Sequence, residues 1–276
     1  MSQSSLRVAI LDMYKGEPNQ GMRCIIDIVR RFNAMVDFKV YDTRGKGELP
    51  DMKAYDIYIS TGGPGNPLDG DGIWDRAYFD FVDGLLEWNR TQEVKKYMLF
   101  ICHSFQMACH HFGLAEITKR KSTSFGIMPV HKTPDGLNDA LFEGLPNPFY
   151  AIDSRDYQVV QPKLKVFEAK GAKILSLEKI RDHVQYERAI MAVRFNPYFV
   201  GTQFHPEADP ISYIANLKSR EKRERIIEMK GKSKFRDMLE DLLDEDKIYK
   251  TNETIIPNFL RGAINDLMDQ KKMLSN

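Results

Sequence analysis

Short apolar runs alternate with amphipathic segments along the first part of the chain. Four runs are rich in β-forming residues and are typical of buried strands: residues 7–11, 38–41, 55–60 and 97–101. The spacing of apolar residues predicts helices over residues 21–33, 74–88 and 103–112. Strands that alternate with helices indicate a parallel sheet with helices on both faces.

From residue 123 to residue 204 the pattern changes to closely spaced short strands. They are expected at residues 126–131, 149–153, 165–169, 173–177, 189–194 and 199–204. Turn signals such as Pro134-Asp135-Gly136 and Asn196-Pro197 separate them. This pattern predicts an antiparallel region attached to the parallel sheet.

The chain changes character again near Lys218. Residues 218–236 are dominated by basic side chains and residues 237–246 by acidic ones, and both stretches have amphipathic helical spacing. A further helix is expected over residues 257–273, with Pro257 at its first position. Its apolar residues fall on one face: Leu260, Ile264, Leu267 and Met268.

This change of pattern divides the chain into a domain over residues 1–217 and a C-terminal helical extension over residues 218–276. The extension either packs on its own domain or docks a partner, which includes a second copy in a homo-oligomer. No sequence feature decides between the two roles.

Composition narrows the class of protein. The chain has 276 residues, 42% of them hydrophobic, which suffices for one substantial core. A net charge of +1 gives no case for a nucleic-acid or membrane-surface protein, and no apolar stretch approaches the ~18 residues of a membrane helix. Three cysteines are too few and too odd in number for a disulfide framework. Together these features predict a cytoplasmic protein with reduced thiols.

Cys102 stands at the junction of a predicted strand and a predicted helix. In open α/β folds, ligands bind at the edge of the sheet where such junctions lie. The positive end of the helix dipole there favours the thiolate, which is the reactive form of cysteine. Cys102 is therefore a candidate nucleophile, and the alternative is a buried structural cysteine like Cys24 or Cys109.

Two other segments carry candidate chemistry. In Gly201-Thr202-Gln203-Phe204-His205-Pro206-Glu207, an extended backbone places His205 and Glu207 on one face, where the carboxylate can orient the imidazole. In residues 60–67, the glycine-rich loop after a strand can aim backbone N–H groups at a developing oxyanion. The alternatives are a surface pair and a plain tight loop. The adjacent His110 and His111 lack further ligands at metal spacing, so no metal site is expected.

Together, these three segments resemble the class I glutamine amidotransferases, and among them the glutaminase domain of GMP synthetase. The resemblance covers about residues 7–211 and implies a flavodoxin-like fold, no cofactor and a Cys-His-Glu triad. By resemblance, the triad is Cys102, His205 and Glu207, with the backbone N–H groups of Gly63 and His103 as the oxyanion hole. It also implies substrate-binding roles for these residues: Gly62, Gly65, Gln106, Ser154 and Tyr157.

Two segments depart from the family pattern. Phe100 and Ser104 stand where the family usually has glycine around the nucleophile, and Phe100 is expected to repack the turn or narrow the pocket. In Ser154-Arg155-Asp156-Tyr157-Gln158-Val159, Ser154 and Val159 fit the family's head-group segment, whereas Arg155 and Tyr157 do not align.

The resemblance implies that the protein releases ammonia from the glutamine side chain through a γ-glutamyl thioester on Cys102. About 60 residues follow the family-like region, too few for a synthetase domain, so an ATP-dependent synthetase that accepts the ammonia would be a separate chain. Two alternatives remain: a standalone γ-glutamyl hydrolase or peptidase with the same triad, and a non-catalytic regulatory module with the same fold.

Overall fold

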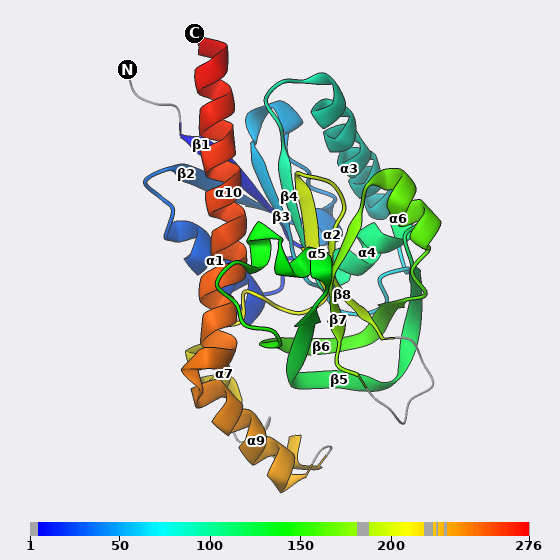
Figure 1. Cartoon of the computed structure of the whole chain (residues 1–276), viewed down its shortest axis with the longest axis vertical. Helices are drawn as coiled ribbons and strands as arrows, with labels where there is room; N and C mark the ends of the chain where they lie inside the picture. The colour runs from blue at the N-terminus through cyan, green and yellow to red at the C-terminus, as the bar shows by residue number, and fades with distance from the viewer. Residues whose placement is uncertain (1–4, 181–187, 218–222, 225, 229–230, 276) are drawn as a thin grey trace.

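A computed structural model describes residues 5–180, 188–217, 223–224, 226–228 and 231–275 of the chain. Its centre is a nine-stranded sheet in the order β2-β1-β3-β4-β9-β8-β7-β5-β6 (Figure 1). The first five strands in this order run parallel: β2 (Val36–Tyr41), β1 (Leu6–Leu11), β3 (Ile57–Ser60), β4 (Tyr97–Ile101) and β9 (Phe199–Thr202). This confirms the predicted parallel sheet.

The other strands extend the same sheet with antiparallel pairing, which confirms the predicted antiparallel region. They are β8 (Ile190–Arg194), β7 (Lys173–Glu178), β5 (Glu116–Lys132) and β6 (Phe149–Val160). β5 and β6 form a long hairpin whose register shifts between Lys119 and Ser124. The hairpin is longer than the sequence pattern predicts.

Helices cover both faces of the sheet. Their bounds are α1 (Gln20–Arg30), α2 (Thr43–Lys46), α3 (Trp74–Thr91), α4 (His103–His111), α5 (Pro134–Leu137), α6 (Leu164–Lys170), α7 (Pro210–Leu217), α9 (Lys232–Leu243) and α10 (Lys250–Ser275). Short helical turns are η1 (Met52–Ala54), η2 (Ala140–Phe142) and η3 (Glu245–Tyr249). Along β1, Val8 and Ile10 join one core with α1 and α10, whereas Ala9 and Leu11 join the other core with α3 and α4.

Two predicted elements are wrong. The expected strand at residues 165–169 is helix α6, which buries Phe167 and ends at Gly171 in the left-handed conformation. A short apolar run fits either structure, and this one alternates too weakly to decide. Pro257 lies inside α10 instead of at its first position. Burial of the flanking Ile256 and Phe259 outweighs the backbone hydrogen bond that proline cannot donate.

The C-terminal helix packs along the body of the molecule. Leu260, Ile264 and Leu267 are buried in the core that α1 shares with the sheet. The Tyr97 hydroxyl bonds the Asp266 carboxylate, which ties α10 to β4. The apolar face that the sequence assigned to this helix is therefore covered by its own domain. The helix expected at residues 218–236 lies partly outside the described residues, and within that range α9 begins at Lys232.

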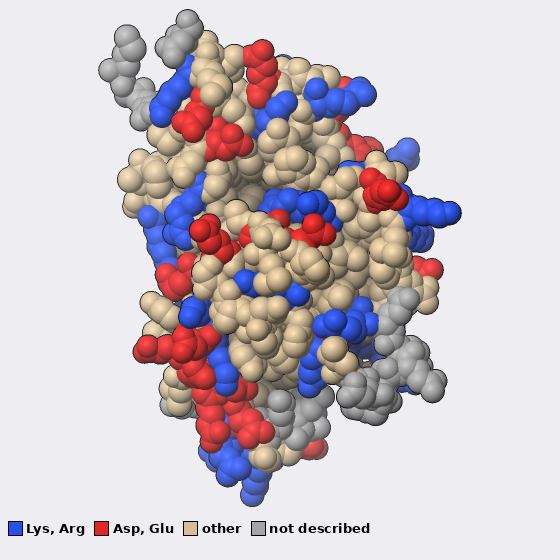
Figure 2. All heavy atoms as spheres, in the orientation of Figure 1, with Lys and Arg blue, Asp and Glu red and all other residues tan. Residues whose placement is uncertain are grey.

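Charged side chains of both signs are mixed over the face in Figure 2, in line with the net charge of +1. Within the described ranges, no helix is long and apolar enough to cross a membrane.

Candidate active site

Cys102 occupies the sharp turn between β4 and α4. Its φ of +49° is uncommon for a residue other than glycine, and such strain clusters at functional sites. The ladder next to it holds this conformation, since Cys102 N donates to Thr202 O at 2.8 Å. Because β4 and β9 run parallel side by side, the thiol and the segment after β9 meet at one edge of the sheet.

The two unusual residues of this turn point away from the cavity. Ser104 donates its hydroxyl hydrogen to Ser60 O at 2.7 Å and accepts from Ile101 N at 2.9 Å, which fastens the turn to β3. Phe100 is fully buried among aromatic rings and pairs in register with Gly201. A Cβ at Gly201 would lie 3.1 Å from the Phe100 Cβ, so the glycine leaves room for the phenylalanine. Phe100 therefore lies in the core and does not narrow the cavity.

Replacing Ser104 with alanine is expected to lower the free energy of unfolding by about 1–2 kcal/mol, because it leaves buried main-chain groups of the turn unsatisfied. Urea denaturation measures the change, and Ser154→Ala is the control because that side chain is exposed. Equal stability of Ser104→Ala and the wild type would mean that the hydroxyl does not hold the turn.

His205 and Glu207 follow β9 and face the thiol. His205 Nδ1 lies 2.8 Å from Glu207 Oε1, and His205 N donates to Ile152 O at 2.9 Å. Burial lowers the pKa of His205, but the negative charges of Cys102 and Glu207 together outweigh it and hold that pKa well above its usual range. A Cβ at Gly62 would lie 3.0 Å from His205 Cε1 and 3.6 Å from Cys102 Cβ, so both side chains converge on this glycine.

The glycine-rich loop passes close to its neighbours. A Cβ at Gly63 would lie 2.6 Å from Met13 O, so only glycine fits there without a shift. Arg44 of α2 donates to Pro64 O at 2.6 Å and holds the loop from outside. Across the cavity, burial and the charge of Arg44 lower the pKa of His103 to about 3, which leaves its ring neutral. Sequence reasoning missed Arg44, which carries no local signal.

Two buried amides lie beside the nucleophile. Gln106 Nε2 donates to Tyr157 O and to Gln203 Oε1, both at 3.0 Å, so its donors are used within the protein. Gln203 Nε2 lies 3.8 Å from Cys102 Sγ. Sequence reasoning gave Gln203 no role, although its position two residues before His205 in an extended segment is a signal that could have found it.

Arg155 is the residue that does not align with the family segment, and the structure shows how it is accommodated. Its side chain is almost fully buried, and Nε lies 2.9 Å from both carboxylate oxygens of Asp153. Glu178 lies 3.8 Å from the same guanidinium. Arg155 is therefore neutralised within the protein, although it borders the cavity.

A cavity of about 940 Å³ joins these groups. The predicted site residues that line it are Gly63, Gly65, Cys102, His103, Gln106, Ser154, Tyr157, His205 and Glu207, whereas Gly62 lies beneath it and spaces His205 from the nucleophile. Its wall also includes Tyr14, Phe125, Tyr213 and Ile226, which the sequence did not single out. In the part of the chain that the structure describes, no cluster of residues could hold a metal ion.

Comparison with known proteins agrees with this geometry. A sequence model of the family Glutamine amidotransferase class-I matches residues 10–217. The chain belongs to the class I glutamine amidotransferases. The resemblance noted from the sequence is thereby confirmed. Among curated proteins, no sequence matches the chain.

Solved structures of this class I amidotransferase's relatives share its fold. A glutamine amidotransferase from Thermotoga maritima matches with a TM-score of 0.67 and 20% identity, over 95% of this chain and 99% of that one. A putative GMP synthase protein from Thermoplasma acidophilum matches with a TM-score of 0.58 and 14% identity, over 99% and 100%. The Trypanosoma brucei CTPS glutaminase domain with bound acivicin matches with a TM-score of 0.54 and 13% identity, over 74% and 86%.

Proposed function

We propose that this class I amidotransferase is a glutaminase that releases ammonia from the side chain of glutamine. The observation that carries the proposal is the convergence of Cys102, His205 and Glu207 on one cavity at the edge of the sheet. A buried imidazole with a raised pKa beside a thiol is suited to hold the proton that a departing amine needs.

The first half of the reaction makes a thioester. The Cys102 thiolate attacks the γ-carbonyl carbon, and the carbonyl electron pair moves to oxygen, where the backbone N–H groups of Gly63 and His103 stabilise it. When the C–N bond breaks, the His205 imidazolium gives its proton to nitrogen and ammonia leaves. Glu207 keeps the imidazole in its working tautomer and orientation.

The second half releases glutamate. Neutral His205 takes a proton from water, whose oxygen adds to the thioester carbon. The C–S bond then breaks, which returns the Cys102 thiolate and the imidazolium. The sum is glutamine and water to glutamate and ammonia, and none of these steps calls for a cofactor. Gly65, Gln106, Ser154 and Tyr157 border the space where the rest of the substrate would lie.

We expect the ammonia to be used by an ATP-dependent synthetase on a separate chain. Two structures with the same fold carry names of this type, the GMP synthase protein of Thermoplasma acidophilum and the CTPS glutaminase domain. The extension after residue 217 is too short for such a domain.

A γ-glutamyl hydrolase is the second candidate, and the size of the cavity favours it. Its volume of about 940 Å³ exceeds the need of a single amino acid and lies at the large end of ligand sites. Phe125, Tyr213 and Ile226 in its wall suit an apolar group attached to the γ-nitrogen.

One assay separates these functions. Purified protein is mixed with glutamine and, separately, with γ-glutamyl anilides or peptides, and ammonia, glutamate and free amine are measured. Ammonia from glutamine supports the glutaminase, and faster release of a larger amine supports the hydrolase. Inactivity on every substrate, with Cys102 unreactive toward an electrophilic glutamine analogue, would contradict both and leave a non-catalytic module.

A further inference from the structure

The first turn of α10 reaches the candidate triad, although it lies beyond the residues that match the family. Asn252 is 3% exposed, and its Nδ2 donates to the main-chain carbonyl of Glu207 at 2.8 Å. The neighbouring Thr251 is buried as well, and its hydroxyl donates to Tyr150 O on β6 at 2.6 Å. Two consecutive polar side chains of the extension thus bond two separate segments of the domain.

Both of these segments hold His205. Glu207 lies two residues after the histidine and bonds its Nδ1. Tyr150 lies two residues before Ile152, whose carbonyl accepts from His205 N. The start of α10 therefore fixes the main chain on either side of the imidazole.

The Glu207 side chain depends on this main-chain anchor. Oε1 bonds His205, whereas Oε2 is buried and has no hydrogen-bond partner among the described residues. With only one oxygen held, the orientation of the carboxylate follows the position of its backbone. A displaced carboxylate would leave the imidazolium less well stabilised in a buried site.

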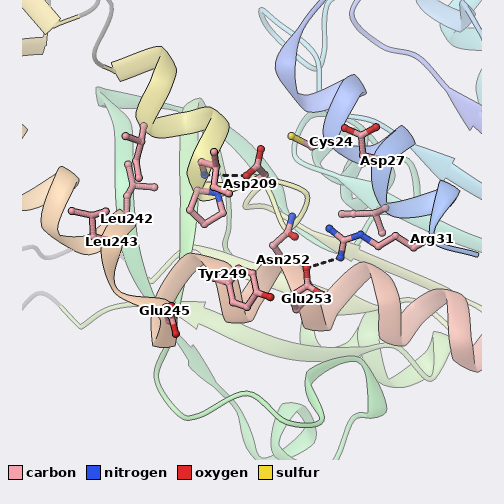
Figure 3. Close-up of a pocket in the computed structure, with 14 residues that line it drawn as sticks. Cys24, Asp27, Arg31, Asp209, Leu242, Leu243, Glu245, Tyr249, Asn252 and Glu253 are labelled. Atoms are coloured by element: carbon pink, nitrogen blue, oxygen red, sulfur yellow. Dashed lines mark hydrogen bonds and ion pairs between the residues drawn. The ribbon is translucent and has the colours of Figure 1, made fainter.

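The surroundings of Asn252 keep this contact in place. Figure 3 shows Asn252 on α10 beside Glu253, in the wall of a second cavity of about 450 Å³ between α1, α7 and α10. The Glu253 carboxylate pairs with Arg31 of α1 at 2.5 Å. This ion pair and the buried face of α10 fix the helix against α1 at the turn that carries Asn252.

We propose that Asn252 is a positioning residue, which acts through the Glu207 main chain to hold the His205–Glu207 pair in its working geometry. The proposal rests on the proposed function for the roles of His205 and Glu207. It gives the extension a part in the reaction, separate from any docking of a partner.

The test compares Asn252→Ala with Asn258→Ala. Asn258 lies on the same helix, and its Nδ2 also donates to main-chain carbonyls, those of Ala140, Leu141 and Glu143, but far from the triad in the chain. Asn252→Ala is expected to lower kcat roughly tenfold with KM unchanged, because small displacements of catalytic groups are costly. Asn258→Ala is expected to lower Tm and leave kcat unchanged. Asn252→Asp, which keeps the shape and loses the amide donor, serves if the alanine variant does not fold.

The pH profile separates positioning from a loss of stability. The titratable groups that interact with His205 are Cys102, Glu207, Tyr14 and Tyr213, and burial raises the pKa of Tyr213 to about 12, so both tyrosines stay neutral. A looser Glu207 lowers the pKa of His205, so the alkaline limb of kcat moves to lower pH in Asn252→Ala and stays in place in Asn258→Ala. Identical limbs in the two variants would overturn the proposal.

Alkylation of Cys102 by iodoacetamide gives the same comparison without a substrate. The alkaline part of its pH profile is expected to change in Asn252→Ala and not in Asn258→Ala. If the wild type cleaves no glutamine but this profile changes, the proposed function fails and the positioning role stands. If glutamine is cleaved and neither profile changes, the positioning role fails alone.

Discussion

Cys102→Ala is expected to abolish ammonia release while the protein keeps the Tm of the wild type. Without the sulfur no thioester can form, and neither His205 nor Glu207 can take its place. Stability should change little, because the thiol makes only long contacts, 3.9 Å to Ser154 O and 3.8 Å to Gln203 Nε2. Steady-state assays with glutamine and thermal unfolding measure the two effects.

Cys109→Ala is the matched control on the same helix. Cys109 is fully buried, and burial raises the pKa of its thiol well above the usual range, so it should not react. This variant is expected to lose stability and to keep its activity per folded molecule. Activity in Cys102→Ala, or a large fall in its Tm, would mean that Cys102 is a structural residue.

Gly63→Ala is expected to reduce kcat by roughly 100–1,000-fold, the usual cost of losing one oxyanion donor. The added Cβ would lie 2.6 Å from Met13 O, and a backbone atom cannot give way as a flexible side chain can. The loop must therefore move, and the N–H of residue 63 moves with it. Glutaminase kinetics with a parallel measurement of Tm test this expectation.

Gly262→Ala is the control for adding a methyl group. Gly262 lies on the exposed side of α10 with nothing near its Cβ position, so alanine there should raise stability by about 0.5–1 kcal/mol and leave kcat unchanged. A Gly63→Ala variant as active as Gly262→Ala would remove this loop from the oxyanion hole.

Much of the fold was predictable because its signals are local. Strand and helix alternate in the parallel half, and each strand there is a continuous apolar run, as the buried strands β3 and β4 illustrate. Local signals failed where packing decided the outcome. Phe167 anchors a helix in a segment that fits a strand equally well, and α10 continues through Pro257 because both sides of it are buried.

The candidate site divides in the same way. Cys102, His205 and Glu207 stand in short motifs, so their types and spacing predicted which residues would converge. Asn252 and Arg44 belong to no motif, and they reach the site only through the packing of α10 and α2. The likeness of Phe100 to an obstruction also came from sequence alone, whereas the room for its ring comes from Gly201 on a distant stretch of chain.

The most direct test of Cys102 as the nucleophile is labelling of the native protein with an electrophilic glutamine analogue, followed by mass spectrometry of the cysteine peptides. We expect one adduct per chain on Cys102, prevented by excess glutamine, with Cys24 and Cys109 unlabelled because both are buried. Labelling is also expected to be slower when His205 is replaced with alanine. An unlabelled Cys102, or an adduct that forms equally on all three cysteines, would contradict the proposed nucleophile.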